Sequence, residues 1–434
     1  MARHRPPALS RRWRAAEVER LATVIGVQAD LQQLRNQLVS ELRESGHVSS
    51  ERVAAAFRTV RRHVFVPGVE PERAYRDEPL IIKSDPHRVP ISSSSQPAIM
   101  ARMLEQLDVR PGHRVLEIGT GSGYNAALLA QLVGETGAVV SVDIDVDLVE
   151  DARARLAECG VSQVTVGCGD GGLGWTEHAP YDRIIATVGA WDIPPAWVTQ
   201  LASDGRLVMP LDLRGPQRSI AWQRVGDHLE SVSVVRCGFM RLRGAFAGPD
   251  PIRQISLEPP VFLGAAEHHA VDEDALSAAL TQPGADVPSG VRATLDEVSD
   301  GLSLWLALHE PAMAWVSTIG AAADRALVLG VYYAVRKPVA LGTAALVSTD
   351  SLAALVRLDD EQPFELGALP LGPDGHHLAQ RLVEHIHDWD IRGRPCSTGL
   401  HVSAYPHDTD PTAITDPGTV IDKRYNRLTL TWAS

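Results

Sequence analysis

One glycine-rich stretch, residues 115–124, constrains this chain more than any other part of its sequence. It reads V-L-E-I-G-T-G-S-G-Y, and its apolar first half predicts a short buried strand. The next residues predict a tight turn with glycines at Gly119, Gly121 and Gly123, and residues 125–132 predict a helix that leaves it. Such a turn lets the backbone approach a ligand closely, because no Cβ holds the ligand away.

The glycine spacing separates two kinds of nucleotide site. A dinucleotide-binding loop has the pattern G-x-G-x-x-G, which would require glycine where this chain has Tyr124. The spacing here is G-x-G-x-G, with Glu117 two residues before the first glycine, and it favours the S-adenosylmethionine loop of class I methyltransferases. A turn that merely packs a helix on a sheet remains the alternative.

Strands and helices alternate after this turn, which predicts a doubly wound, mostly parallel sheet. Residues 138–142 form the next expected strand, and it ends at Asp143, where a carboxylate can accept from ribose hydroxyls; Asp145 is the alternative. A third strand at residues 164–166 leads to Asp170, which can accept from an adenine amine. Further strands are expected at residues 181–187 and 205–210, and a β-hairpin at residues 220–235.

A serine run precedes the glycine loop. Residues 92–95 are serines, and Gln96 and Pro97 lead into an expected helix at residues 98–107. The serines therefore predict either an N-cap for this helix or a cluster of hydroxyls that faces the ligand loop, and the sequence favours neither.

Net charge, cysteine content and the lack of long apolar segments argue against several classes of protein. The net charge of −13 argues against nonspecific nucleic-acid binding, although arginines crowd residues 3–14, which we expect to be a solvated arm. Four cysteines without paired spacing, no signal-peptide core and no uninterrupted apolar span predict a cytoplasmic protein without a membrane segment. Histidines cluster between residues 376 and 407, but their spacing matches no familiar metal site.

The last part of the chain predicts an α+β domain of its own. Residues 249–260 are expected to be a Pro-rich linker, and the tryptophans Trp305, Trp315 and Trp389 are expected in the core. The expected elements are helices at residues 270–280 and 374–389 and strands at 327–335, 339–347, 351–358 and 424–432. With no second catalytic motif in it, we expect this domain to hold a peptide substrate.

The chain from about Val53 to Phe246 resembles the protein-L-isoaspartate O-methyltransferases. The matching segments follow one another in order: Arg61–Pro67, Tyr75-x-Asp77-x-Pro79, Ser95-Gln96-Pro97, Val115–Tyr124, Gly169-Asp170-Gly171, Gly174-Trp175, Ala179–Ile185 and Gly205–Pro210. The resemblance implies three parts: a basic arm and helix at residues 1–52, a Rossmann-like class I methyltransferase domain at 53–246, and the α+β extension at 247–434.

The resemblance also implies roles for individual residues. It implies S-adenosyl-L-methionine as the methyl donor, with S-adenosyl-L-homocysteine as product, bound by Glu117, Gly119, Thr120, Gly121, Gly123, Tyr124, Asp143, Ile144, Asp170 and Gly171. The catalytic positions would be Ser95, Ser94 and Thr187, and those beside the acceptor Gln96, Val188, Gly189 and Ala190. No metal, nucleic acid or membrane partner is implied.

Three departures from the family pattern bear on the acceptor. Gln96 and Ala98 replace a small residue and a histidine, Asp143 stands where glutamate is usual, and the long extension is uncommon among repair enzymes. The extension resembles the branch encoded with ribosomal peptide natural products, such as FxLD-type lanthipeptide, graspetide and lasso systems. That branch implies methylation of an aspartate in a modified precursor peptide, whose ester leads to aspartimide and then isoaspartate. Repair of isoaspartyl protein, and peptide binding without catalysis, remain the alternatives.

Overall fold

The computed structural model describes residues 30–86, 89–249, 252–258, 260–265, 270–319, 340–414 and 418–433. The chain forms two compact units, and the boundary between them falls between Gly169 and Asp170 in the sequence. The predicted arm at residues 3–14 and the predicted strand at residues 327–335 lie outside the described residues.

The first unit begins with helices. Residues 30–44 are helical, and α2 (Glu51–Thr59) starts where the Ser50 hydroxyl accepts from the backbone N–H of Val53 at 3.2 Å. A serine hydroxyl at this position caps the helix, because it satisfies a backbone N–H of the first turn. The next elements are η1 (Arg62–Phe65), α3 (Pro71–Ala74) and an antiparallel pair, β1 (Leu80–Ser84) with β2 (Pro90–Ser94).

Helix α4 (Pro97–Leu107) corrects one of the two interpretations of the serine run. Its N-cap residue is Gln96, which makes no side-chain capping bond, and Ser92–Ser94 lie in β2 instead. The Asp77 carboxylate takes over the capping role, because its Oδ1 accepts from the backbone N–H of Ala98 at 2.7 Å. The N-cap interpretation of the serines was therefore wrong.

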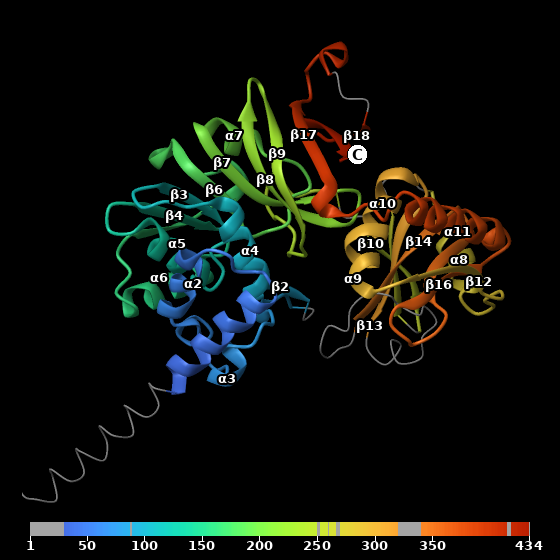
Figure 1. Ribbon diagram of the computed structural model, residues 1–434, viewed down its shortest axis with the longest axis horizontal. Coiled ribbons are helices and arrows are strands. Elements are labelled where there is room, and N and C mark those ends of the chain that lie inside the picture. Colours follow the sequence, from blue (N-terminus) through green and yellow to red (C-terminus); the bar gives the residue numbers. More distant parts are fainter. Residues whose placement is uncertain are drawn as a thin grey trace, which may run out of the picture. The chain divides into compact units, whose positions relative to one another are not determined.

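The glycine loop joins a parallel β-α-β-α-β segment. Its strands are β3 (Arg114–Ile118), β4 (Ala138–Asp143) and β5 (Val164–Cys168), with β4 in the middle and Leu116 opposite Val140. Helices α5 (Tyr124–Val133) and α6 (Val146–Glu158) pack against these strands (Figure 1). Almost every side chain of β3 and β4 is buried, as expected for strands covered on both faces.

The second unit holds a mixed sheet. It includes β6 (Tyr181–Ala186), β7 (Leu201–Asp212), β8 (Gln217–Val225) and β9 (His228–Arg236), with η2 (Gly171–Leu173), η3 (Thr176–His178) and α7 (Pro195–Gln200) between them. Strands β6 and β7 are parallel, and β7, β8 and β9 are antiparallel. The predicted hairpin is confirmed, with Gly226 at its turn in the left-handed region (φ +62°).

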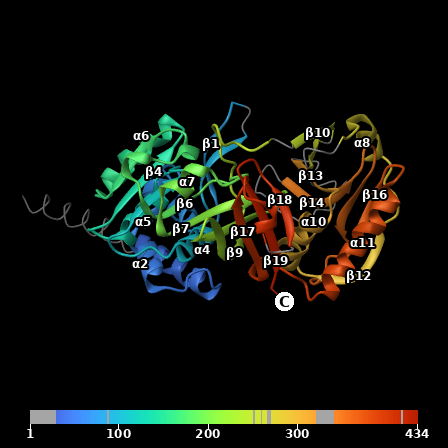
Figure 2. The ribbon, with the colours of Figure 1, turned by 90° about the horizontal axis from the view of Figure 1, so that it is seen from above.

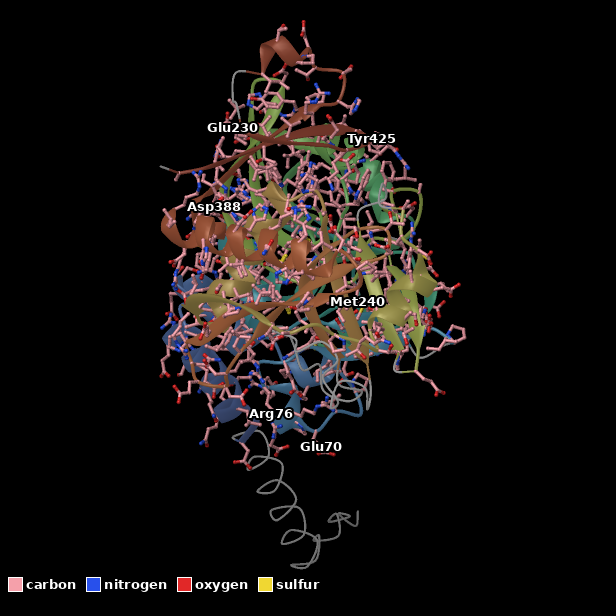
Figure 3. All side chains as sticks on the ribbon, turned by 90° about the vertical axis from the view of Figure 1, so that its right-hand side faces the viewer. Glu70, Arg76, Glu230, Met240, Asp388 and Tyr425 are labelled. Carbon is pink, nitrogen blue, oxygen red and sulfur yellow. The ribbon has the colours of Figure 1, made fainter. Side chains whose placement is uncertain are left out.

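The end of the chain returns to this sheet. Strand β17 (Leu400–Pro406) pairs with β9, where Ser403 lies opposite Glu230, the residue labelled in Figure 3. Strands β19 (Asn426–Trp432) and β18 (Thr419–Asp422) follow outward from β17, as the red strands of Figure 2 show beside β9. Only part of residues 247–434 therefore belongs to a separate sheet.

Within the part of the chain that the structure describes, that separate sheet has seven antiparallel strands. Their order is β10 (Ile252–Leu257), β11 (Pro260–Ala265), β13 (Met313–Ile319), β14 (Ala340–Val347), β15 (Leu352–Arg357), β16 (Phe364–Leu371) and β12 (Val287–Ala293). The prediction of a linker at residues 249–260 was wrong, because β10 occupies half of it. The strand forms because Ile255 is buried in the core that lies under α8 (Glu273–Ala279).

Helices cover this sheet, in agreement with the predicted α+β class. The face opposite α8 packs against α11 (Gly375–Ile391) and α10 (Ser303–His309), which α9 (Leu295–Glu297) and the π-turn η4 (Val298–Leu302) precede. The predicted core positions of the tryptophans are confirmed: Trp305 and Trp389 are buried, and Trp315 packs against them half-buried. The four cysteines are free, and none of the described helices has the length and apolarity needed to cross a membrane.

Candidate functional site

The glycine loop adopts the backbone conformation that requires glycine. Gly119, Gly121 and Gly123 have φ angles of +97°, +51° and +87°, a region that other L-residues rarely adopt. A Cβ on Gly121 would lie 3.5 Å from the carbonyl oxygen of Ser93 and 3.6 Å from the hydroxyl of Ser92. The serine strand β2 therefore lies directly against the loop, which agrees with the second interpretation of the serine run.

Asp143 connects the end of β4 to this loop. Its Oδ2 accepts from the backbone N–H of Gly121 at 2.8 Å, and its Oδ1 accepts from the backbone N–H of Asp145 at 3.1 Å. The alternative acid, Asp145, is held instead by an ion pair with Lys83 at 3.3 Å. Ile144 between them exposes 39% of its surface, an apolar face beside a carboxylate that suits a nucleoside.

Glu117 lies behind the loop rather than in front of it. It is completely buried; its Oε1 accepts from Asn125 Nδ2 at 2.7 Å, and its Oε2 accepts from the Ser141 hydroxyl at 2.5 Å. The hydroxyl of Thr120, also buried, lies 2.7 Å from that of Ser141. Burial raises the pKa of Glu117 to about 7. We therefore interpret Glu117 and Thr120 as residues that hold the loop in place.

Tyr124 is a second predicted cofactor residue whose side chain turns inward. Its ring is 1% exposed and contacts the rings of Phe57 and Phe65, with centroids 6.3 and 5.8 Å away. Any contact between Tyr124 and a ligand in the loop therefore comes from its backbone at the start of α5.

The serines between β2 and α4 are placed by residues whose roles the sequence did not reveal. Ser94 is 3% exposed, and its hydroxyl has no hydrogen-bond partner within the described residues. The carbonyl of the half-buried Ser95 accepts from Arg62 Nη2 at 3.0 Å, and the fully buried Arg62 also donates to the carbonyls of Arg76 and Glu78. Gln96 Nε2 donates to Asp77 Oδ2 at 2.8 Å. Arg62 and Asp77 stood inside recognised motifs, but nothing local in the sequence indicated these contacts.

In the second unit, Asp170 begins the turn that follows β5. Its Oδ1 accepts from the backbone N–H of Gly172 at 2.9 Å, and its Oδ2 accepts from that of Ala245 at 2.7 Å. The carbonyl of Gly171 accepts from Trp197 Nε1 at 2.9 Å. The carboxylate of Asp170 is thereby fixed from both sides, and each of its oxygens retains a further lone pair.

The predicted acceptor loop follows β6. Thr187 and Val188 are half-buried, whereas Gly189 and Ala190 are buried. The backbone N–H of Gly189 donates to the carbonyl of Met240, labelled in Figure 3, and that of Ala190 donates to the carbonyl of Pro210. These two amides are engaged within the protein, so the part of the loop nearer to solvent is Thr187–Val188.

These observations fit a nucleoside with a positively charged sulfur. The loop offers bare backbone beside a carboxylate at a strand end. The unpartnered hydroxyl of Ser94 belongs to the residue after Ser93, whose carbonyl approaches this loop. Among the described residues, no three His, Cys, Asp or Glu side chains form a group that would hold a metal ion. Two histidines of α11 contact residues far away in the sequence: His385 lies 3.1 Å from Glu310 Oε2, and His387 lies 2.7 Å from the carbonyl oxygen of Ser289.

Comparisons with known proteins agree with this geometry. The family model described as protein-L-isoaspartate(D-aspartate) O-methyltransferase matches residues 32–245. A protein-L-isoaspartate O-methyltransferase of Methanopyrus kandleri is 43% identical over 184 residues, which are 42% of this chain and 79% of that protein. Protein-L-isoaspartate O-methyltransferase 2 of Archaeoglobus fulgidus is 38% identical over 222 residues, which are 50% of this chain and 96% of that protein.

Solved structures with related names also match. A protein-L-isoaspartate O-methyltransferase aligns with a TM-score of 0.47 at 22% identity, over 85% of this chain and 96% of its own. An enzyme from Plasmodium falciparum, described as a complex with S-adenosyl-L-homocysteine, aligns with a TM-score of 0.42 at 19% identity, over 48% of this chain and 98% of its own. The extent and identity of the sequence matches show that this chain belongs to the protein-L-isoaspartate O-methyltransferase family of S-adenosylmethionine-dependent carboxyl methyltransferases.

Proposed function

We propose that this enzyme methylates the side-chain carboxylate of an aspartate in a ribosomally made, modified precursor peptide. The methyl ester then closes to an aspartimide, which water opens to isoaspartate. We also propose that it works in the cytoplasm, where its four free cysteines would stay reduced.

The geometry of the loop and of the two strand ends supports an assignment of the residues that would hold the donor. S-adenosylmethionine, when bound, supplies an electrophilic methyl group on a positively charged sulfur. The bare backbone of Gly119–Gly123 would line the methionine part, Asp143 would accept from the ribose hydroxyls, and Asp170 would accept from the adenine amine. The exposed side chain of Ile144 would cover one face of the base.

The acceptor needs no general base. A peptide carboxylate has a pKa of about 4 and is ionised at neutral pH. The protein therefore has to orient one carboxylate oxygen toward the methyl group, and orientation of this kind can contribute about 7–11 kcal/mol. We assign this role to the hydroxyls of Ser95, Ser94 and Thr187, with Val188 beside the acceptor.

The later steps follow from the ester itself. The carboxylate oxygen forms a bond to the methyl carbon, and the carbon–sulfur electrons stay with sulfur. The next backbone nitrogen then attacks the ester carbonyl and loses its proton, and the methoxide leaves as methanol. Water opens the imide at either carbonyl, which gives aspartate or isoaspartate.

One observation supports a dedicated acceptor over general repair. The extension adds β17–β19 to the strand β9, and the turn before β19 contacts residues 191–193, directly after the predicted acceptor loop. A repair enzyme must accept isoaspartate in many sequence contexts, so added structure beside the acceptor loop favours recognition of one peptide. Repair methylation remains the competing function, because it is the activity for which the family is named.

The test compares two acceptors with the intact protein. An aspartyl precursor peptide and an isoaspartyl peptide would be incubated separately with S-adenosylmethionine and followed by mass spectrometry. We expect methylation of the aspartyl peptide followed by loss of methanol; methylation of the isoaspartyl peptide alone would establish repair instead. Ser95→Ala should lower turnover far more than the affinity for S-adenosylhomocysteine, whereas Ser40→Ala, on a remote exposed helix face, should change neither.

A further inference from the structure

The turn between β18 and β19 is fastened to the segment that follows the acceptor loop. Asp192 is 7% exposed; its Oδ2 accepts from the backbone N–H of Tyr425 at 2.6 Å, and its Oδ1 accepts from Asn426 Nδ2 at 2.7 Å. Asn426 Nδ2 also donates to the carbonyl of Ile193 at 2.8 Å. One buried carboxylate therefore receives two donors from a hairpin more than two hundred positions later in the sequence.

A second residue of the turn strengthens this attachment. Lys423 is 5% exposed; its Nζ donates to the carbonyl of Asp212 at 3.1 Å and lies 4.7 Å from the ring centre of Trp191. The backbone N–H of Asp212 donates to the carbonyl of Ala190, the last residue of the acceptor loop. The turn therefore contacts Asp212 and Trp191, the residue that follows Ala190, next to the hydrogen bond that joins Asp212 to the loop.

Aromatic packing continues the same surface toward Asp170. The rings of Tyr425 (labelled in Figure 3) and Phe246 lie 5.5 Å apart. Phe246 covers Gly172, where an added Cβ would lie 2.4 Å from its ring, and its neighbour Ala245 donates to Asp170. The hairpin turn therefore packs against Phe246, next to the residue that donates to Asp170.

From these contacts we infer that the β18–β19 turn, residues 423–426, is a positioning element of the methyl-transfer site. It sets the acceptor loop Thr187–Ala190 through Asp192, and it thereby selects the peptide that presents its carboxylate there. The loop follows the carboxyl end of the parallel strand β6, the edge at which ligands bind in α/β sheets. This inference rests on the assignment of that loop to the acceptor proposed above, and it holds for an aspartyl or an isoaspartyl acceptor.

The test uses two substitutions in neighbouring residues of the full-length protein. Asn426→Ala removes both side-chain donors to residues 192–193, whereas the control Arg427→Ala removes only an ion pair within the hairpin, between Arg427 and Asp422. For Asn426→Ala we expect a fall of about tenfold in kcat/KM, measured with whichever of the aspartyl and isoaspartyl peptides the wild type methylates. This is the size of effect that the loss of a hydrogen bond to a charged group produces. The affinity for S-adenosylhomocysteine should stay within about twofold of wild type. The control should leave both unchanged.

Two outcomes of this comparison would overturn the inference. One is acceptor kinetics in Asn426→Ala equal to those of the control; the other is an equal loss of acceptor turnover and S-adenosylhomocysteine affinity, which indicates general damage. Hydrogen exchange of residues 187–193 provides a reading without any acceptor. Exchange should accelerate in Asn426→Ala and not in Arg427→Ala, and unchanged exchange in Asn426→Ala would overturn the inference. This reading does not depend on the proposed function, which would be refuted separately if no peptide were methylated.

A third variant distinguishes the proposed role from a simple folding defect, because its effect should be reversible with pH. Asn426→Asp places a second carboxylate beside Asp192 in a buried site, where Lys423 is the adjacent cation. Two carboxylates at this distance do not both ionise readily, so kcat/KM for the peptide should fall reversibly as the pH rises, while wild type does not show that fall. A pH profile identical to that of wild type would contradict the inference.

Discussion

Replacement of Glu117 by glutamine should stabilise the protein at neutral pH, although it removes a charged group beside the glycine loop. Glu117 is completely buried, and its two oxygens accept from Asn125 and Ser141. A glutamine can keep both contacts, because its oxygen accepts from Asn125 and its amide donates to the Ser141 hydroxyl, which can rotate to accept.

The expected magnitude follows from the pKa of this carboxyl. Burial raises it from 4.5 to about 7, so the folded protein retains a proton that the unfolded chain has released. As the pH rises from 4.5 to 7, each pH unit lowers the stability of the folded state by about 1.4 kcal/mol. Over this range the free energy of unfolding falls by about 3 kcal/mol in total. The loss is complete above pH 7 and absent below pH 4.5, and Glu117→Gln should abolish it.

Hydrogen exchange of residues 114–133, compared with wild type at each pH between 5 and 8, measures this difference locally. Glu117→Gln should gain protection that grows with pH, and Glu150→Gln, at an exposed position of α6, should not. Destabilisation by the same amount at every pH would refute the reasoning. That result would mean that the ionised carboxylate itself holds the loop.

Three further substitutions test other parts of the structure. Gly123→Ala places a Cβ at φ +87° and 3.2 Å from Ala152 Cβ; it should cost about 1–2 kcal/mol and weaken S-adenosylhomocysteine binding by calorimetry. The control Gly134→Ala, also at positive φ but with open space around its Cβ, should affect stability alone. Arg62→Lys should lower the urea midpoint by the equivalent of about 2 kcal/mol and reduce kcat, because one ammonium cannot reach all three carbonyls that the guanidinium binds. Arg381→Ala should cost about 3 kcal/mol at pH 7, because it strips the buried carboxylate of Glu310 of its cation. That loss should shrink in unfolding experiments as the pH falls from 4.5 toward 2, where the paired carboxylate is protonated; a loss that does not change with pH would contradict this.

The sequence predicted the parts of the fold that local patterns determine. The parallel strands around the glycine loop, the hairpin at Gly226 and the helix at residues 273–279 follow from periodicity, turn residues and caps, and all are present. The prediction of a linker was wrong because the prolines of this segment suggested irregular structure. The segment forms a strand because it is buried under α8, a helix that follows it in the chain.

Long-range pairing explains what the sequence did not reveal in the candidate site. The backbone approach of the loop could be predicted, because it is encoded in adjacent glycines. The inward orientation of Glu117, the support of Ser95 by Arg62 and the attachment of Asp192 to Asn426 depend on partners 24, 33 and 234 positions away. No periodicity in a single sequence reports such pairs, so the roles of these side chains required the three-dimensional structure.

The return of β17 to β9 has a practical consequence for anyone who shortens this protein. The seven-stranded sheet is an insertion between β9 and β17 in the sequence. Strand β17 pairs with β9, so the last strands cover an edge of the sheet that β9 would otherwise expose to water. A protein truncated before residue 400 would expose unpaired backbone N–H and C=O groups along β9, and an exposed strand edge of this kind promotes aggregation. Removal of the added sheet should instead keep residues 237–249, because Met240 and Ala245 hold Gly189 and Asp170, and should join them to the segment that leads into β17.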